Sequence, residues 1–274
     1  MENIKQGQII YGVRSLEYPD IPCHGIVITA SCDIAQKKVK NIHFVSMVSL
    51  DRWLLDNCVY SLIEIKIKEL RRNLEIWMVS VNLDMKVLQI WELDKIKKLF
   101  LQENKGQSNY DKYLLLLEFE TFLKTELTEQ RRADILLKTL SKEKKTRVQQ
   151  IMSNQITGYY YIPPNETSYL ANSKGYVVNL RDVNTIEFSV FAQMVDGYLD
   201  CKINKEILKD EILTKLFYLE EEEDYSYTLD SLKSPRIEHL MQAFSAMFTR
   251  IGLDDMCRDL QNKIATSVDV DEIR

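Results

Sequence analysis

Glycine is scarce in this chain, and its scarcity excludes a large class of ligand sites. Only 8 of the 274 residues are glycine, about half the usual share. Loops that cradle phosphates need residues without a side chain, because the backbone must approach the phosphate closely. The sequence contains none of the glycine-rich fingerprints of dinucleotide-binding, P-loop or nucleophile-elbow folds. Enzymes of these types are therefore not expected.

Long apolar runs, histidine and paired cysteines are also few. No uninterrupted apolar stretch approaches the roughly 20 residues that span a bilayer, and the N-terminus lacks a signal-peptide pattern. We therefore expect a cytoplasmic protein without membrane contact. The five cysteines are an odd number at irregular spacing, which is typical of reduced thiols. The three histidines limit any mechanism that needs several imidazoles.

The remaining composition is typical of a folded globular protein. Hydrophobic residues make up 45% of the chain, and 36 basic residues against 41 acidic ones give a net charge of -5. This balance creates no positive field over the whole surface, so nucleic acid is not the favoured partner. The 14 tyrosines suit amphipathic contact surfaces and favour protein partners or a homo-oligomer.

Hydrophobic periodicity predicts an α+β fold in which two β-rich segments flank a helical middle and the chain closes with a helical pair. The predicted division is a β-rich N-terminal domain at 1–93, a helical segment at 94–156 and a mixed region, strands before helices, at 157–274. Strands in the first segment are predicted from β-branched and alternating runs. They lie at 9–13, 25–30, 43–48, 61–67, 75–81 and 87–91.

The later segments contain both kinds of element. Helices are predicted at 94–100, over much of 110–153 (which lacks glycine and proline) and at 204–219. Further strands are predicted at 159–162, 175–180, 185–191 and near Tyr198. The final pair of helices is predicted at 235–251 and 254–264. Ser234 as an N-cap and Pro235 at the first helical position define the start of this pair.

Two runs of like charge stand out. Five consecutive acids at 220–224 predict a solvated loop, with a metal or a basic partner as the alternative contact. The basic run is predicted to be a solvated face, and nucleic-acid binding is its alternative. In that alternative, Arg71, Arg72 and the tyrosines at 159–161 would assist. The basic side chains are Lys142, Lys144, Lys145 and Arg147.

The chemically most suggestive cluster surrounds Cys32. A predicted strand ends near Cys32 and Asp33, and His43 begins the next strand, so antiparallel pairing would bring the three residues close together. In the simplest interpretation, Cys32 is a small buried residue and Asp33 binds backbone amides of the turn. The alternatives are a zinc site formed by Cys32, Asp33 and His43, or a thiolate nucleophile at Cys32 activated by His43. No cofactor other than this alternative zinc is predicted.

Two segments carry a resemblance to a group of uncharacterised bacterial proteins. The first runs from Ile28 to Leu54 and contains Thr29, Cys32, Asp33, Ile34, Ala35 and Lys38. The second runs from Ser234 to Gly252 and contains Pro235, Glu238, His239, Leu240, Phe248, Arg250 and Ile251. The resemblance implies an accessory or sensing component of an antiviral defence system, without naming an activity.

Three functions follow as hypotheses. The leading one is a cytoplasmic accessory or sensor subunit that acts through protein–protein contacts and is not an enzyme. The second is a metal- or thiol-dependent enzyme working at Cys32, Asp33 and His43. The third is a nucleic-acid-binding protein that uses the basic run at 142–147.

Overall fold

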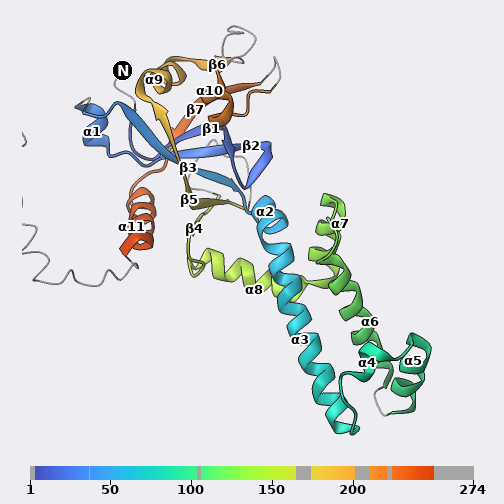
Figure 1. The fold of residues 1–274 in the computed structure, drawn as a ribbon. Coiled ribbons are helices and arrows are strands. Elements are labelled where there is room, and N and C mark those ends of the chain that lie inside the picture. Colours follow the sequence, from blue (N-terminus) through green and yellow to red (C-terminus); the bar gives the residue numbers. More distant parts are fainter. Residues whose placement is uncertain are drawn as a thin grey trace, which may run out of the picture.

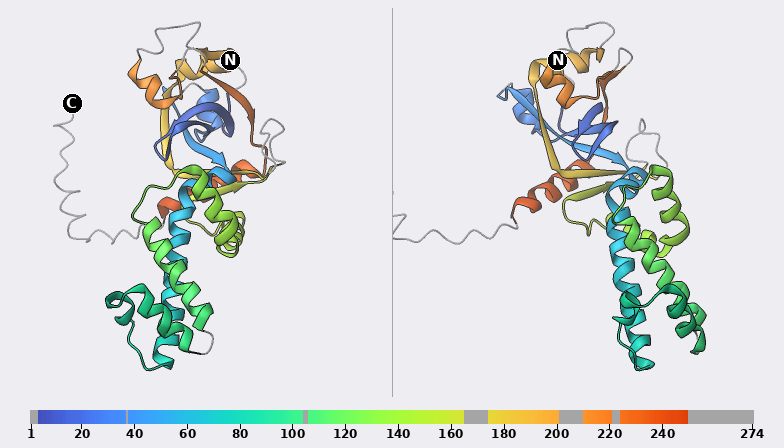
Figure 2. Two further views of the ribbon diagram at one scale, coloured as in Figure 1. Left: turned by 90° about the vertical axis from the view of Figure 1, so that its right-hand side faces the viewer. Right: turned by 45° about the vertical axis from the view of Figure 1, so that its right-hand side comes forward.

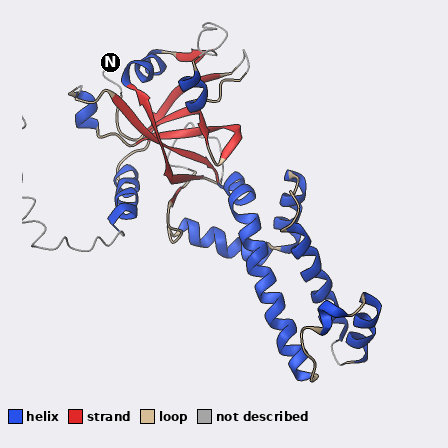
Figure 3. Cartoon of the chain, in the orientation of Figure 1, coloured by secondary structure: helices blue, strands red, loops and turns tan. Residues whose placement is uncertain are grey.

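One antiparallel sheet joins strands from both ends of the chain. The computed structural model describes residues 4–36, 38–103, 106–164, 174–200, 210–220 and 224–249. Seven strands lie in the order β4-β5-β3-β2-β1-β7-β6. Figure 3 shows the strands, in red, gathered in one part of the molecule. They are β1 (Gln8–Ser15), β2 (Tyr18–Val27), β3 (Asn41–Ser49), β4 (Tyr159–Ile162), β5 (Tyr176–Glu187), β6 (Tyr198–Asp200) and β7 (Tyr225–Ser231). The predicted α+β class is confirmed.

Between β3 and β4 the chain leaves the sheet and forms a helical arm, residues 50–152. Figures 1 and 2 show α3 and α6 side by side, running away from the sheet, with α4 and α5 at the far end and α8 near the sheet. The arm consists of α2 (Leu50–Trp53), the π-helical turn η1 (Leu54–Cys58), α3 (Val59–Ser80), α4 (Val87–Ile90), α5 (Leu93–Gln102), α6 (Gly106–Phe122), α7 (Glu129–Asp134), the π-helical turn η2 (Ile135–Thr139) and α8 (Ser141–Met152).

The strands predicted at 61–67, 75–81 and 87–91 are wrong, because these residues form α3 and α4. The alternation of Ile63, Ile65 and Ile67 misled the prediction. Ile63 and Ile67 face the core, whereas Ile65 is 46% exposed. Over its full length α3 buries a residue every three or four positions, which is the helical period. The helical arm therefore begins at Leu50, inside the segment predicted to be β-rich.

The predictions for the chain after residue 93 were confirmed in part. The helices predicted at 94–100 and within 110–153 are confirmed. The strand predicted at 159–162 is β4, which pairs with β5. The strand predicted at 185–191 ends at Glu187, where α9 (Phe188–Asp196) begins, and β7 was not predicted. Of the helix predicted at 204–219, the structure describes α10 (Glu211–Leu216), which the Asp210 side chain caps. The predicted helix at 254–264 lies outside the described residues.

Helices cover both faces of the sheet. On one face, Phe44 and Val13 pack in a core that includes Phe217 after α10, Phe191 of α9 and Trp53 at the base of the arm. On the other face, α11 (Arg236–Thr249) buries Leu240 against strand residues of all the central strands. The apolar side of this helix therefore packs on the core of the protein's own sheet. The strand residues of this second core include Ile9, Ile26, Val45, Met47 and Val178.

None of the helices in the described part of the chain combines the length and the apolar character needed to cross a membrane.

Candidate functional site

Cys32 and Asp33 lie in α1 (Ser31–Ala35), a short helix after β2. Cys32 is exposed, which contradicts the interpretation of it as a buried residue. Its Sγ contacts Asp33 Oδ1 at 3.7 Å. Thiolate nucleophiles are stabilised by nearby positive charge, and a carboxylate supplies none. The described surroundings of Cys32 therefore offer no activation of the kind that the enzyme hypothesis requires.

His43 approaches this helix through its backbone and turns its ring elsewhere. The predicted antiparallel pairing of β2 and β3 is confirmed, and the His43 amide donates to Thr29 Oγ1 at 2.7 Å. The exposed imidazole, however, is hydrogen-bonded through Nδ1 to Thr185 Oγ1 on β5, at 2.9 Å. No group of three or more His, Cys, Asp or Glu side chains able to hold a metal ion occurs among the residues described. The catalytic and zinc roles of Cys32, Asp33 and His43 stay predictions.

The basic run does not form one continuous positive face. It lies on α8, where Lys142 and Lys145 are exposed, whereas Lys144 and Arg147 are half-buried. Glu143 forms an ion pair with Lys66 of α3 at 3.0 Å, so this turn of α8 fastens two helices of the arm together. Burial raises the pKa of the Cys58 thiol, and the positive charge of Arg147 partly opposes this increase. The run therefore contributes to packing of the arm as well as to its surface.

Two of the three tyrosines assigned to base stacking are not available for it. Tyr160 and Tyr161 of β4 are buried, and the Tyr161 hydroxyl donates to the Lys174 carbonyl at 2.9 Å. Arg71 of α3 is paired with Glu120 of α6 at 2.7 Å. Bases stack only on exposed ring faces. The nucleic-acid hypothesis thus loses two of the three tyrosines that it named, and the third, Tyr159, is half-buried.

A polar network, here called the joint, connects the arm to the sheet. Asp56 in η1 accepts ion pairs from Arg52 of α2 and from Arg132 of α7, the latter at 3.1 Å. Its side chain is only 12% exposed. A buried carboxylate is tolerated only where positive charge compensates it. Asp56 therefore ties the start of the arm to its returning helix.

The next residue, Asn57, extends the joint to the strands. Its side-chain amide donates to Glu17 at 2.9 Å and its oxygen accepts from the Tyr18 hydroxyl. Tyr159 of β4 donates to Glu17 at 3.3 Å. Burial, reinforced by the Glu17 carboxylate, raises the pKa of Tyr159 to about 12, so its hydroxyl stays a donor at neutral pH.

Two further cysteines lie buried close to the joint and are not exposed to reagents. Burial raises the pKa of Cys23 and that of Cys58 to about 12. Both thiols therefore stay protonated near neutral pH and act as small apolar residues. The prediction of reduced thiols holds for the cysteines described, Cys23, Cys32 and Cys58. Cys201 and Cys257 lie outside the described residues.

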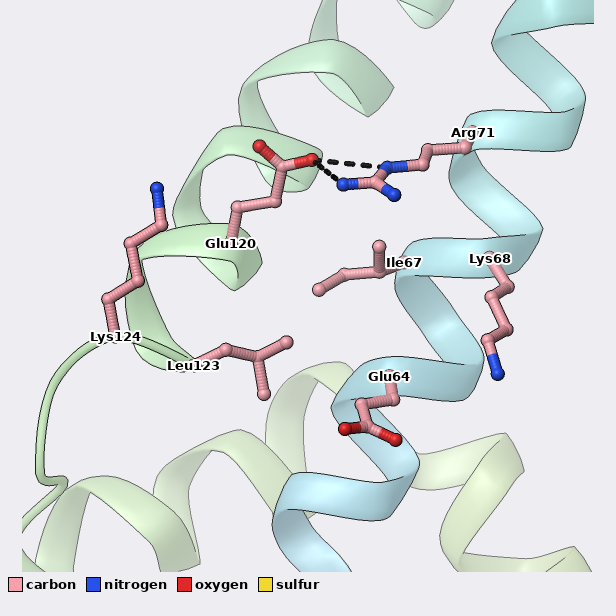
Figure 4. Close-up of a pocket in the computed structure, with 7 residues that line it drawn as sticks. All are labelled: Glu64, Ile67, Lys68, Arg71, Glu120, Leu123 and Lys124. Atoms are coloured by element: carbon pink, nitrogen blue, oxygen red, sulfur yellow. Dashed lines mark hydrogen bonds and ion pairs between the residues drawn. The ribbon is translucent and has the colours of Figure 1, made fainter.

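A groove of about 430 Å³ lies between α3 and α6 of the arm (Figure 4). Ile67 and Leu123 point toward each other across it, and the Arg71–Glu120 ion pair bridges one end. Both signs of charge occur at its rim, so the groove has no strong preference for an anionic or a cationic ligand. The remaining lining residues are Glu64, Lys68 and Lys124.

The arm also exposes apolar side chains to an unusual extent. It carries eleven of the sixteen large hydrophobic residues that are exposed in the described structure. Val79 at the end of α3 is 67% exposed and Ile90 at the end of α4 is 76% exposed. The others at the far end are Ile76, Trp91, Leu93 and Leu101. The sequence did not reveal this surface, because it predicted strands at 75–81 and 87–91 where the structure has helices.

No protein-family model, curated protein or solved structure matches this chain.

Proposed function

We propose that this protein is a cytoplasmic accessory or sensor subunit that binds another protein through its helical arm. The observation that carries the proposal is the gathering of exposed apolar side chains on the arm. Single exposed hydrophobic residues are normal on protein surfaces, whereas concentrations of them mark contact sites. The occupant that fits is an apolar helix or strand face of a partner protein.

The shape of the molecule supports this role. The arm projects from the sheet, and α4 and α5 lie far from it (Figure 2). Its interior is well packed, because Phe100 stacks on Trp77 with ring centroids 4.5 Å apart and lies 5.9 Å from the ring of Tyr113. A rigid interior fixes the positions of the outer side chains, which lowers the entropy cost of binding. The arm therefore presents its apolar surface in a preorganised form.

The setting in which the subunit acts is proposed from the resemblance alone. The segments from Ile28 to Leu54 and from Ser234 to Gly252 resemble a group that we associate with antiviral defence. On that ground, we propose that the partner is encoded beside this chain in such a system.

The test is co-purification of the full chain with the products of its adjacent genes. The triple variant Ile76→Glu, Val79→Glu, Trp91→Glu should lose the partner, because charges at the far end of the arm cannot be desolvated in an apolar contact. Leu16→Glu is the matched control, since Leu16 is 94% exposed in the β1–β2 turn. Partner retention by the triple variant would overturn the proposal. A wild-type dimer in light scattering that the triple variant does not form would also overturn it.

A further inference from the structure

A row of aromatic rings crosses one face of the sheet on strands that are far apart in the sequence. Neighbouring rings in this aromatic strip have centroids 5.3–5.7 Å apart. Such spacing is typical of interacting aromatic pairs. In order, the members are Tyr225 and Tyr227 of β7, Tyr11 of β1, His24 of β2 and Tyr176 of β5.

The aromatic strip is only partly buried. Tyr176 is buried, but Tyr225 at the opposite end is 50% exposed. Tyr11 and Tyr227 between them keep part of their surface in water. The neighbouring area of this face is covered by Leu240 and the rest of the apolar side of α11. The Tyr225 end of the strip is thus an accessible, rigid aromatic surface next to a covered one.

Negative charge lies beside this end. Asp224 directly precedes Tyr225, and its carboxylate accepts a hydrogen bond from the Glu220 amide at 2.8 Å. Burial raises the pKa of Tyr11, and the negative charge of the Asp224 carboxylate adds to this increase. Glu220 and Asp224 are the described ends of the acidic run, for which the sequence predicted a solvated loop and, as the alternative, contact with a metal or a basic partner.

Near Glu220, an arginine of the protein itself is bound by a tyrosine ring and a carboxylate. The Arg14 guanidinium lies over the ring of Tyr218, 5.3 Å from its centroid. The same group donates to Glu220 at 2.8 Å. A ring face attracts a cation through its quadrupole, and a carboxylate adds direct Coulomb attraction. One arginine of the protein itself therefore sits between a tyrosine and an acid.

We propose that the Tyr225 end of the aromatic strip, together with Asp224, binds an arginine- or lysine-rich segment of a partner protein. Tyr225 and Tyr227 offer ring faces to the cations, and the acidic residues set the sign of the charge that is accepted. Phosphate-bearing ligands are repelled by the same carboxylates, so the aromatic rings do not form a nucleic-acid platform. This surface is separate from the arm and goes beyond the proposed function.

The test is titration of the full chain with a fluorescent arginine–glycine peptide, with a glutamate–glycine peptide of equal length as the second probe. The wild type should bind only the first. Tyr225→Leu should weaken binding about fivefold, because it removes the ring. Tyr225→Phe should leave affinity within about twofold, because the ring face remains. Asp224→Asn should weaken binding and flatten its dependence on salt, since one charge of the site is lost.

Trp91→Leu is the matched control, because it removes a ring of similar exposure from the arm. It should leave peptide affinity unchanged, so that failure here and failure of arm binding are distinguishable. Circular dichroism checks that each variant is folded, and Asp224→Asn tests the site if Tyr225→Leu is not. Equal affinity of wild type and Tyr225→Leu, equal losses with Trp91→Leu, or no arginine-peptide binding would each overturn the proposal.

Discussion

The sheet and the helical arm differ in how far their contacts reach along the chain. β1 pairs with β7, which places Gln8 opposite Ser231, so the sheet needs both ends of the chain. The arm is built from consecutive helices between residues 50 and 152. Contacts over long sequence separations cost more loop entropy than local ones. The sheet is therefore the cooperative scaffold, and the arm is a locally stabilised extension of it.

The two regions also differ in how they treat apolar surface. The sheet is covered on both faces by helices, whereas the arm leaves most of the exposed large hydrophobic side chains of the described chain in water. A scaffold gains stability from complete burial, and a contact surface must keep part of its apolar area accessible. The comparison indicates that the sheet supplies most of the complete burial, and that the arm carries most of the exposed apolar surface.

The largest effect is expected from a cavity in the sheet. Phe44 is fully buried on β3 and stacks on Phe217, with ring centroids 6.4 Å apart. Phe44→Ala should lower the free energy of unfolding by about 3–5 kcal/mol. Thermal unfolding followed by circular dichroism would measure it, and hydrogen exchange should show loosened strands from both ends of the chain. A loss confined to β3 would contradict the cooperative scaffold.

The joint is the next most sensitive place. Asp56→Ala leaves Arg52 and Arg132 without their shared carboxylate and should cost about 3 kcal/mol. Because the joint fastens the arm to the strands, hydrogen exchange should rise in α2 and α7 more than in the sheet. Asp51→Ala, which removes the exposed partner of Lys174, is the control and should change little. Equal effects of the two substitutions would show that the joint does not couple the regions.

Acid should weaken the sheet before the arm. Burial lowers the pKa of His24 from 6.5 to about 4. The folded state therefore binds this proton less readily than the unfolded chain, and stability falls as the pH drops below 6.5, by about 2 kcal/mol at pH 5. Chemical denaturation at pH 7 and pH 5 measures this difference. All three histidines lie outside the arm. His24→Phe should reduce the pH dependence, and an unchanged slope would contradict the assignment.

The smallest effect is expected from the interior of the arm. Phe100→Leu keeps an apolar side chain but removes the stacking on Trp77 and the ring contact with Tyr113, at a cost of about 1–2 kcal/mol. Since the contacts are local, faster hydrogen exchange should be confined to α3, α5 and α6. Spread of the change into β1 or β7 would indicate that arm and sheet unfold together. The wild-type exchange pattern is the reference.

The predictions from sequence succeeded where the local pattern and the tertiary environment agree. The run at 43–48 is a central strand whose apolar residues face both covered sides, and the Ser234–Pro235 pair marks the start of α11 within a residue. They failed at 61–67, because three isoleucines at alternate positions fit a strand equally well over so short a window. Only the longer spacing, from Leu62 to Met78, distinguishes the helix.

The predicted site shows the same limit. The sequence correctly placed the backbone of His43 next to the end of β2, because antiparallel neighbours in sequence usually pair. It could not show that the imidazole bonds Thr185, a residue that is distant in the sequence. The aromatic strip was beyond prediction for the same reason, since Tyr11 and Tyr225 meet only after β1 and β7 have paired.

The sequence by itself determined the α+β class, the absence of glycine-rich phosphate loops, and the helical character of 94–153. These properties follow from composition and local periodicity, which act within a few turns of chain. Tertiary structure alone decided that the strands form one sheet, that the arm begins at Leu50, and that rings from distant strands align beside acidic residues. Such features depend on long-range pairing and on which faces are finally buried, and no local pattern encodes either of them.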